Sequence, residues 1–221
     1  SGSADKVHLV PFGEYLPFAW IFGYLRALTQ QSGRFDPGDD HVVLPLPGSD
    51  VDLGVFICYE SIFPSIPRTL VRGGAEILVN TTNDAWFGTS SAPEQHLAMA
   101  ALRAVENGRS VVRAANTGIS CIIDPQGQIR QATELFTTTS LTADVAPRTE
   151  ITPYTRMGDW IFVLSAAVLV AAAALAERRR GREVHAEMEV ARRELERWTR
   201  DGALRAALPP ADVGGDQPLV R

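Results

Sequence analysis

Short apolar runs alternate with amphipathic stretches from Lys6 to about Ala146, and this pattern predicts a layered α/β domain. The runs at 51–58 and 76–80 are almost continuously apolar, which is typical of buried strands. The segment between them ends at Gly73-Gly74 and predicts a helix, because paired glycines commonly terminate helices.

A second helix is expected at 91–107, beginning with Ser91 as its N-terminal cap. Leu97, Ala101 and Val105 follow one another at intervals of four residues, so they are expected on one helical face. Short strands joined by turns at Asn116-Thr117-Gly118 and Asp124-Pro125-Gln126-Gly127 then predict hairpins. These strands are expected at 110–115, 118–124 and 127–133.

A different pattern begins at Trp160, where 17 residues up to Ala176 carry no charge. This length is the short end of the roughly 17–25 residues that a spanning helix needs, and a buried core helix is the alternative. An aromatic residue at one end and a group of arginines at the other favour a transmembrane helix with its arginine end in the cytoplasm. The arginines are Arg178, Arg179, Arg180 and Arg182. The α/β domain is then expected outside the cytoplasm.

Residues 177–221 are expected to form a cytoplasmic amphipathic helix and a disordered tail. Apolar positions from Val184 to Trp198 are spaced by four, three, four and three residues, as in a coiled-coil seam. Two heptads do not establish a coiled coil, so a helix that lies on the bilayer or frays in the cytosol is the alternative. Disorder is expected after Pro209-Pro210. The chain thus divides into 1–155, 160–176 and 177–221.

Composition narrows the function classes. A net charge of −5 leaves no overall basic surface for nucleic acid, so no nucleic-acid partner is expected. The two cysteines, Cys58 and Cys121, form no CxxC or Cys/His cluster, and neither a metal nor an organic cofactor is expected. Cys121 lies within an apolar run and is expected to be a buried strand residue. The chain opens with Ser1-Gly2-Ser3 rather than Met, which indicates a fragment or a processed chain.

Cys58 is the candidate nucleophile, because it ends an apolar strand and precedes a helix. A side chain at such a turn is exposed at the end of the strand, and the amide of Tyr59 lies near a developing oxyanion. A cysteine at a strand end, taken alone, is more often a small core residue. Lys6 adds to the case, since it is the single lysine among 21 basic side chains. Glu14 follows it by eight residues.

Together with Cys58, three segments resemble the nitrilase superfamily: "DKVHLVPFGEY" from Asp5, "NTTNDAWFG" from Asn80 and "RAANTGISCIIDPQG" from Arg113. More narrowly, the ordered motifs "HLVPFGEYLPF", "CYESIFP" and "TNDAWFG…PEQHLAMAALRAVENGR" are similar to those of the bacterial apolipoprotein N-acyltransferases. The resemblance covers the chain from about Lys6 to the apolar helix and does not explain the long tail. It implies an α-β-β-α sandwich, of which 1–155 is the C-terminal part, followed by one transmembrane helix.

The resemblance also implies roles for individual residues. Cys58 matches the nucleophile, Lys6 the triad lysine that stabilises the oxyanion, and Glu14 the second glutamate that supports the lysine. Substrate-binding roles fall on Tyr59, Glu60, Trp86 and Phe87. The general-base glutamate of the superfamily lies upstream of the lysine motif, outside this chain. Each of these residues also has a structural alternative. Lys6 and Glu14 would form a solvated ion pair, Glu60 would be a carboxylate at the start of a helix, and Trp86 and Phe87 would pack in the core.

The implied activity is an acyl transfer in two steps. An acyl chain passes from a membrane phospholipid to the cysteine, and then to the N-terminal amine of a diacylglyceryl-modified lipoprotein. The implied location is the cytoplasmic (inner) membrane, with the catalytic domain on the extracytoplasmic side. Two other functions stay open: a membrane-tethered amidase or carbamoylase of the nitrilase type, and a non-catalytic module that binds a partner through the seam at 183–207.

Overall fold

The computed structural model describes residues 2–17 and 35–207, with the side chains described as far as residue 202. The chain divides into two compact units, Ser1–Asp159 and Trp160–Arg221, and each is considered by itself. The first unit contains one six-stranded sheet in the order β1-β2-β3-β4-β5-β6. Strands β2, β3 and β4 are parallel, whereas β1, β5 and β6 pair antiparallel with their neighbours. The strands are β1 (Val43–Pro45), β2 (Asp52–Ile57), β3 (Ile77–Asn83), β4 (Val111–Asn116), β5 (Cys121–Ile123) and β6 (Ile129–Ala132).

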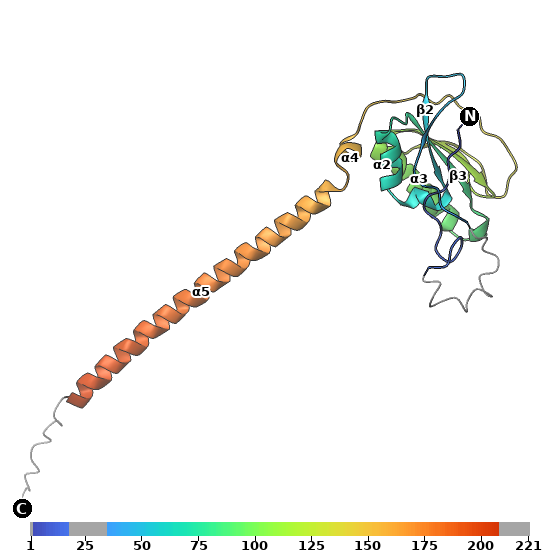
Figure 1. The fold of residues 1–221 in the computed structure, drawn as a ribbon. Helices are drawn as coiled ribbons and strands as arrows, with labels where there is room; N and C mark the ends of the chain where they lie inside the picture. The colour runs from blue at the N-terminus through green and yellow to red at the C-terminus, as the bar shows by residue number, and fades with distance from the viewer. Residues whose placement is uncertain (1, 18–34, 208–221) are drawn as a thin grey trace, which may run out of the picture. The chain divides into compact units, whose positions relative to one another are not determined.

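Helices α2 and α3 lie together in front of the sheet and cover one of its faces (Figure 1). Phe56 on β2, Leu78 on β3 and Val111 on β4 point toward them and are fully buried in the core. Two 3-10 turns follow β2 and β3, and the short α4 closes the unit. The helical elements are η2 (Cys58–Ile62), α2 (Ser65–Arg72), η3 (Ala85–Phe87), α3 (Ala92–Asn107) and α4 (Pro153–Met157).

The predicted face of α3 was only partly right. Leu97 is buried, but Val105 is 50% exposed, and Ala100 and Ala104 make the contact with the core instead. Steps of four residues rotate by about 40° more than one turn, so eight residues rotate the side chain about 80° away from the starting face. Ser91 holds the N-cap position, but its hydroxyl accepts from the side chain of Gln95 (3.2 Å) and caps no backbone amide.

The opposite face of the sheet is apolar and incompletely covered. Val55, Val79, Val112 and Ile122 lie on it and are half-buried. Parallel strands are normally covered on both faces, because βαβ connections and packed layers bury them. The described residues of this unit form a single sheet and show no second sheet packed on this face.

The second unit contains one continuous helix, α5 (Trp160–Ala207). Its most apolar window has a mean hydropathy of 2.2, and it is the one helix in the described ranges that is long and apolar enough to cross a membrane. Val163 and Leu169 are 72% and 70% exposed, as expected of side chains that lipid would surround. The polar segment after Ala176 continues this helix without a break. The predicted disorder after Pro209-Pro210 lies outside the described residues.

Candidate active site

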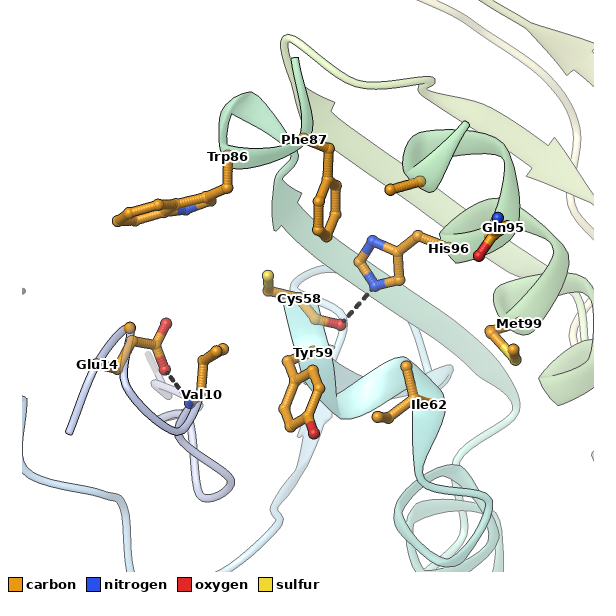
Figure 2. Close-up of a pocket in the computed structure, with 12 residues that line it drawn as sticks. Val10, Glu14, Cys58, Tyr59, Ile62, Trp86, Phe87, Gln95, His96 and Met99 are labelled. Carbon is orange, nitrogen blue, oxygen red and sulfur yellow. Dashed lines mark hydrogen bonds between the residues drawn. The ribbon is translucent and has the colours of Figure 1, made fainter. Parts of the chain in front are cut away.

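Cys58 occupies a strained turn between β2 and η2. Its φ is +54°, in the left-handed region that non-glycine residues rarely adopt and that costs on the order of 1–3 kcal/mol. Hydrogen bonds immediately before the turn hold it. The Ile57 N–H donates to Glu60 Oε2 (2.7 Å), and the buried Asn80 side chain donates to the Phe56 carbonyl (3.1 Å). The turn projects the thiol away from the strand and into a pocket (Figure 2).

Lys6 and Glu14 form a close ion pair beside this turn. Lys6 Nζ lies 2.6 and 2.7 Å from the two carboxylate oxygens, and the side chains are only 12% and 20% exposed. The Val10 N–H donates to Glu14 Oε2 (2.9 Å), and a tight turn brings Glu14 back onto Val10. The pair is therefore partly buried and held by the backbone, unlike a mobile surface ion pair.

Glu60 lies beneath the turn and is 1% exposed. Its Oε1 accepts from the N–H groups of Val7 (2.7 Å) and His8 (3.0 Å), and its Oε2 accepts from Ile57. One carboxylate thus ties the segment that follows Lys6 to the end of β2. These are contacts with the backbone rather than the substrate contact expected from the sequence, and Glu60 lines neither of the two pockets at Cys58.

Two pockets meet at Cys58. The first has a volume of about 400 Å³ and a mainly apolar lining, and the second has a volume of about 630 Å³ and a more polar lining. Both contain Cys58, Glu14 and Trp86, whereas Lys6 belongs to the second. The apolar lining of the first pocket includes Val10, Tyr59, Ile62, Trp86, Phe87 and Met99. The thiol therefore borders a strongly apolar pocket and a more polar one.

The three predicted aromatic residues lie at the first pocket. Trp86 and Phe87 belong to η3, and Trp86 is 67% exposed, so it is not packed into the core. Phe87 contacts the ring of His96 edge-on at a centroid distance of 5.9 Å. Tyr59 packs edge-on against Phe63 with the centroids 5.2 Å apart. Exposed aromatic side chains around an apolar pocket suit a ligand with a hydrocarbon chain.

A buried polar network behind the first pocket was missed from the sequence. His96 Nε2 lies 3.1 Å from the Cys58 carbonyl oxygen, and His96 Nδ1 lies 3.0 Å from Asp84 Oδ1. Arg113 donates to Asp84 Oδ2 (2.8 Å) and also bonds the side-chain oxygen of Asn80. All four side chains are nearly or completely buried. The arginine in the apolar strand at 110–115 was the available signal, since a buried charge requires a partner.

Burial would raise the pKa of the Asp84 carboxyl, but its hydrogen bond with His96 and the charge of Arg113 lower it. The lowering prevails, so the pKa lies below its ordinary value. Asp84 is thus a carboxylate at neutral pH, and its charge offsets that of Arg113.

Cys121 lies on β5 in a different environment. It is fully buried, and burial raises the pKa of its thiol to about 11 against a smaller opposing effect from Arg113. A protonated, inaccessible thiol is a poor nucleophile. Its expected placement in a buried strand is what the structure shows.

One group in the described residues has the spacing of metal ligands, namely His8, His41 and Glu60. Both Glu60 oxygens already accept hydrogen bonds from backbone amides. We therefore assign no metal to this group.

The fold and this site define a class of protein. Residues 1–154 match the carbon-nitrogen hydrolase family, and the chain belongs to this family. The mixed sheet with its helices is the nitrilase-like fold that the motifs predicted, and the family match confirms the expected fold class. An amidase from Nesterenkonia sp. is similar in structure, with 26% identity, 61% of this chain and 46% of the amidase covered, and a TM-score of 0.44.

Curated relatives make the resemblance more specific. A protein of Geobacter metallireducens named apolipoprotein N-acyltransferase is 47% identical over 182 residues, which are 81% of this chain and 34% of the relative. A protein of the same name from Bradyrhizobium diazoefficiens is 44% identical over 185 residues, 82% of this chain and 33% of the relative. The predicted resemblance is confirmed by these names. The chain spans about a third of the length of the curated relatives it matches.

Proposed function

We propose that this chain provides the nucleophile, the oxyanion-stabilising lysine and the acyl pocket of a membrane-bound N-acyltransferase. The acyl donor is a phospholipid, and the acceptor is the N-terminal amine of a diacylglyceryl-modified lipoprotein. The observation that carries the proposal is the position of Cys58, where a strongly apolar pocket meets a more polar one beside the Lys6–Glu14 pair.

In the first step the Cys58 thiolate attacks the ester carbonyl of the phospholipid. The C–S bond forms and the carbonyl oxygen becomes an oxyanion, which Lys6 stabilises by charge and hydrogen bonding. Collapse of this intermediate breaks the ester C–O bond, so that a lysophospholipid leaves as an alcohol after protonation. The acyl chain remains on sulfur as a thioester. The general base that takes the thiol proton is the glutamate that the resemblance places before Lys6.

In the second step the lipoprotein amine attacks the thioester. An amide C–N bond forms, the C–S bond breaks, and the amine proton returns through the base to regenerate the thiol. Two easier steps replace one difficult transfer, which is the advantage of covalent catalysis. The apolar pocket with Trp86, Phe87 and Met99 suits the hydrocarbon chain, and the polar pocket suits the ester and amine.

The proposed location is the cytoplasmic membrane, with α5 crossing it and the arginines after Ala176 on the cytoplasmic side. The uncharged segment 160–176 at the start of α5 and the arginine cluster after it support this orientation. A reporter that is active only outside the cytoplasm tests it. Fusions before Asp159 should be active and fusions after Arg182 inactive, and the reverse pattern would contradict the orientation.

Thioester formation tests the chemistry. The full-length protein that carries this sequence is incubated in detergent with a phospholipid radiolabelled in its acyl chain, and the protein is then treated with hydroxylamine. We expect label that hydroxylamine removes, and we expect a diacylglyceryl-modified peptide to take the label from the enzyme.

Release of label to water, together with hydrolysis of small amides, would indicate an amidase instead. Unimpaired function of Cys58→Ala, with loss after deletion of 183–207, would indicate a non-catalytic module.

A further inference from the structure

The hydrogen bond between His96 and the Cys58 carbonyl joins the buried network to the reacting turn. A carbonyl oxygen only accepts, so His96 Nε2 must carry the proton that it shares across 3.1 Å. His96 Nδ1 faces Asp84 Oδ1 at 3.0 Å and Arg113 Nη2 at 3.1 Å. The imidazole is thereby held from both sides, and its orientation is determined before any substrate arrives.

The peptide bond between Cys58 and Tyr59 connects this contact to the chemistry. A trans peptide is planar, with its C=O and N–H pointing in opposite directions. A hydrogen bond that fixes the Cys58 carbonyl toward His96 therefore directs the Tyr59 N–H away from His96. Figure 2 shows His96 and Glu14 on opposite sides of Cys58, so this N–H points toward the side of the Lys6–Glu14 pair.

The Tyr59 N–H is available for a ligand. It lies in the first turn of η2, where backbone N–H groups lack a partner within the helix. Among the described residues, none accepts a hydrogen bond from it. A free N–H next to the nucleophile, directed toward a lysine, is a suitable donor for an oxyanion.

The network behind His96 is rigid as well as charged. Asp84 also accepts from Thr82 Oγ1 (2.9 Å), and all three polar partners of its carboxylate come from different elements. Gly118 packs directly on this carboxylate, where a Cβ would overlap it. A side chain held in this way moves little, and an oxyanion donor is effective only if it is positioned in advance.

We infer that His96, held by Asp84 and Arg113, is a positioning residue that aims the Tyr59 N–H at the oxyanion. This inference rests on the proposed acyl transfer for its biological meaning, but it concerns any acylation of Cys58. His96 bonds the carbonyl oxygen of Cys58, and no hydrogen bond joins it to the thiol. It acts through the orientation of one peptide plane.

Two amide substitutions of His96 differ in whether they can keep its hydrogen bond to the Cys58 carbonyl. In His96→Asn the side-chain amide takes the place of Nδ1 and can still donate to Asp84 through its NH₂ group or accept from Arg113 through its oxygen, but it is too short for the Cys58 carbonyl. In His96→Gln the longer side chain places an N–H near the former Nε2 and can donate to that carbonyl. Both variants keep a polar group in the buried network, which limits the cost to folding.

The experiment measures two reactions of Cys58 in the full-length protein. Acylation by p-nitrophenyl acetate passes through an oxyanion and releases p-nitrophenolate. Alkylation by iodoacetamide displaces iodide directly and forms no oxyanion. We expect His96→Asn to slow acylation on the order of 10²-fold, near the lower end of the loss of one oxyanion donor. His96→Gln should stay within about tenfold of the wild type, and alkylation should change by less than about threefold in both.

A core variant, Leu97→Ala, is the control for general destabilisation, because Leu97 is buried beside His96 and bonds nothing in the network. It should leave the ratio of acylation to alkylation unchanged. Equal acylation rates in His96→Asn and His96→Gln would overturn the inference, and so would a parallel loss of alkylation. Acylation by p-nitrophenyl acetate without any transfer from phospholipid would contradict the proposed function. The comparison of His96→Asn with His96→Gln would still decide the role of His96.

Discussion

The two cysteines, Cys58 in the turn after β2 and Cys121 in β5, lie in opposite chemical environments. Cys58 lies just beyond the end of β2, in a left-handed backbone conformation, and borders two pockets. Cys121 lies within β5 in extended backbone and is fully buried, with the pKa of its thiol raised to about 11. Both are near the network of Arg113, since Arg113 pairs with Cys121 across the sheet and holds Asp84.

The difference indicates why we propose Cys58, and not Cys121, as the nucleophile. Proximity to a positive charge is not sufficient, because the burial of Cys121 outweighs the effect of Arg113. Position at the end of a parallel strand, a strained turn and access to a pocket distinguish Cys58. The free energy cost of that turn is offset by the hydrogen bond that Glu60 accepts from the Ile57 N–H and by those that Asn80 and His96 donate to the carbonyls of Phe56 and Cys58.

The largest effect is expected when the reactive cysteine is removed. Cys58→Ala should abolish the hydroxylamine-labile label and acyl transfer in the full-length protein, because no other described thiol borders the pockets. Cys121→Ala is the matched control and should label normally. Labelling that survives in Cys58→Ala and disappears in Cys121→Ala would reverse the assignment.

A smaller but still large effect is expected at Lys6. Lys6→Arg keeps the charge, but a planar guanidinium is bulkier than an ammonium and is misplaced in a pair with N–O distances of 2.6 and 2.7 Å. Acyl transfer should fall by about 10²–10³, nearly as far as in Lys6→Ala. The rate of thioester formation measures this, with membrane insertion as the control. Near-normal transfer by Lys6→Arg would show that Lys6 is only a structural charge.

A smaller effect on the rate of thioester formation is expected at Glu60. Glu60→Gln replaces one of its two acceptor oxygens with an NH₂ group that faces backbone donors, either from Val7 and His8 or from Ile57. Loss of a buried hydrogen bond to a charged group costs roughly 1.5–3 kcal/mol. We expect a lower thermal midpoint and about a tenfold slower thioester formation, because the Lys6 segment loosens from the turn. A slower rate without any change in the thermal midpoint would favour direct contact with substrate instead.

Sequence reasoning predicted the fold more completely than the site. The apolar runs at 51–58 and 76–80 correspond to β2 and β3, with shifts of a few residues at their ends. Parallel strands are buried on both faces, so a continuous apolar run is typical of them. The placement of Cys58 at a strand end followed from the same pattern. The motif "NTTNDAWFG" drew attention to Trp86 and Phe87, while Asp84 in the same motif was overlooked.

The partners in the network around His96 could not be predicted from the sequence, for a physical reason. Asp84, His96 and Arg113 come from a loop, a helix and a strand, and only the tertiary fold brings them within hydrogen-bonding distance. Periodicity describes which face of an element is buried, but it does not reveal which buried polar groups meet. The backbone contacts of Glu60 could not be predicted either, since its partners Val7 and His8 are 53 and 52 residues away in the sequence.

The smallest effect on activity is expected at Cys121, where pH gives a separate test of the comparison. Cys121→Ala should leave acyl transfer unchanged and lower the unfolding free energy by about 1–2 kcal/mol at pH 8, since it removes a buried sulfur. The folded thiol keeps its proton up to about pH 11, whereas the unfolded thiol loses it near the ordinary pKa of 9.0. The contribution of the protonated Cys121 thiol to the unfolding free energy is therefore complete below pH 9 and is lost between pH 9 and 11. A shift of about two pKa units corresponds to roughly 2–3 kcal/mol, so the wild type should lose its advantage over Cys121→Ala near pH 10. Thermal midpoints of the two proteins in detergent from pH 8 to 11 measure this difference, and a constant gap between them would show that Cys121 ionises as freely as an exposed thiol.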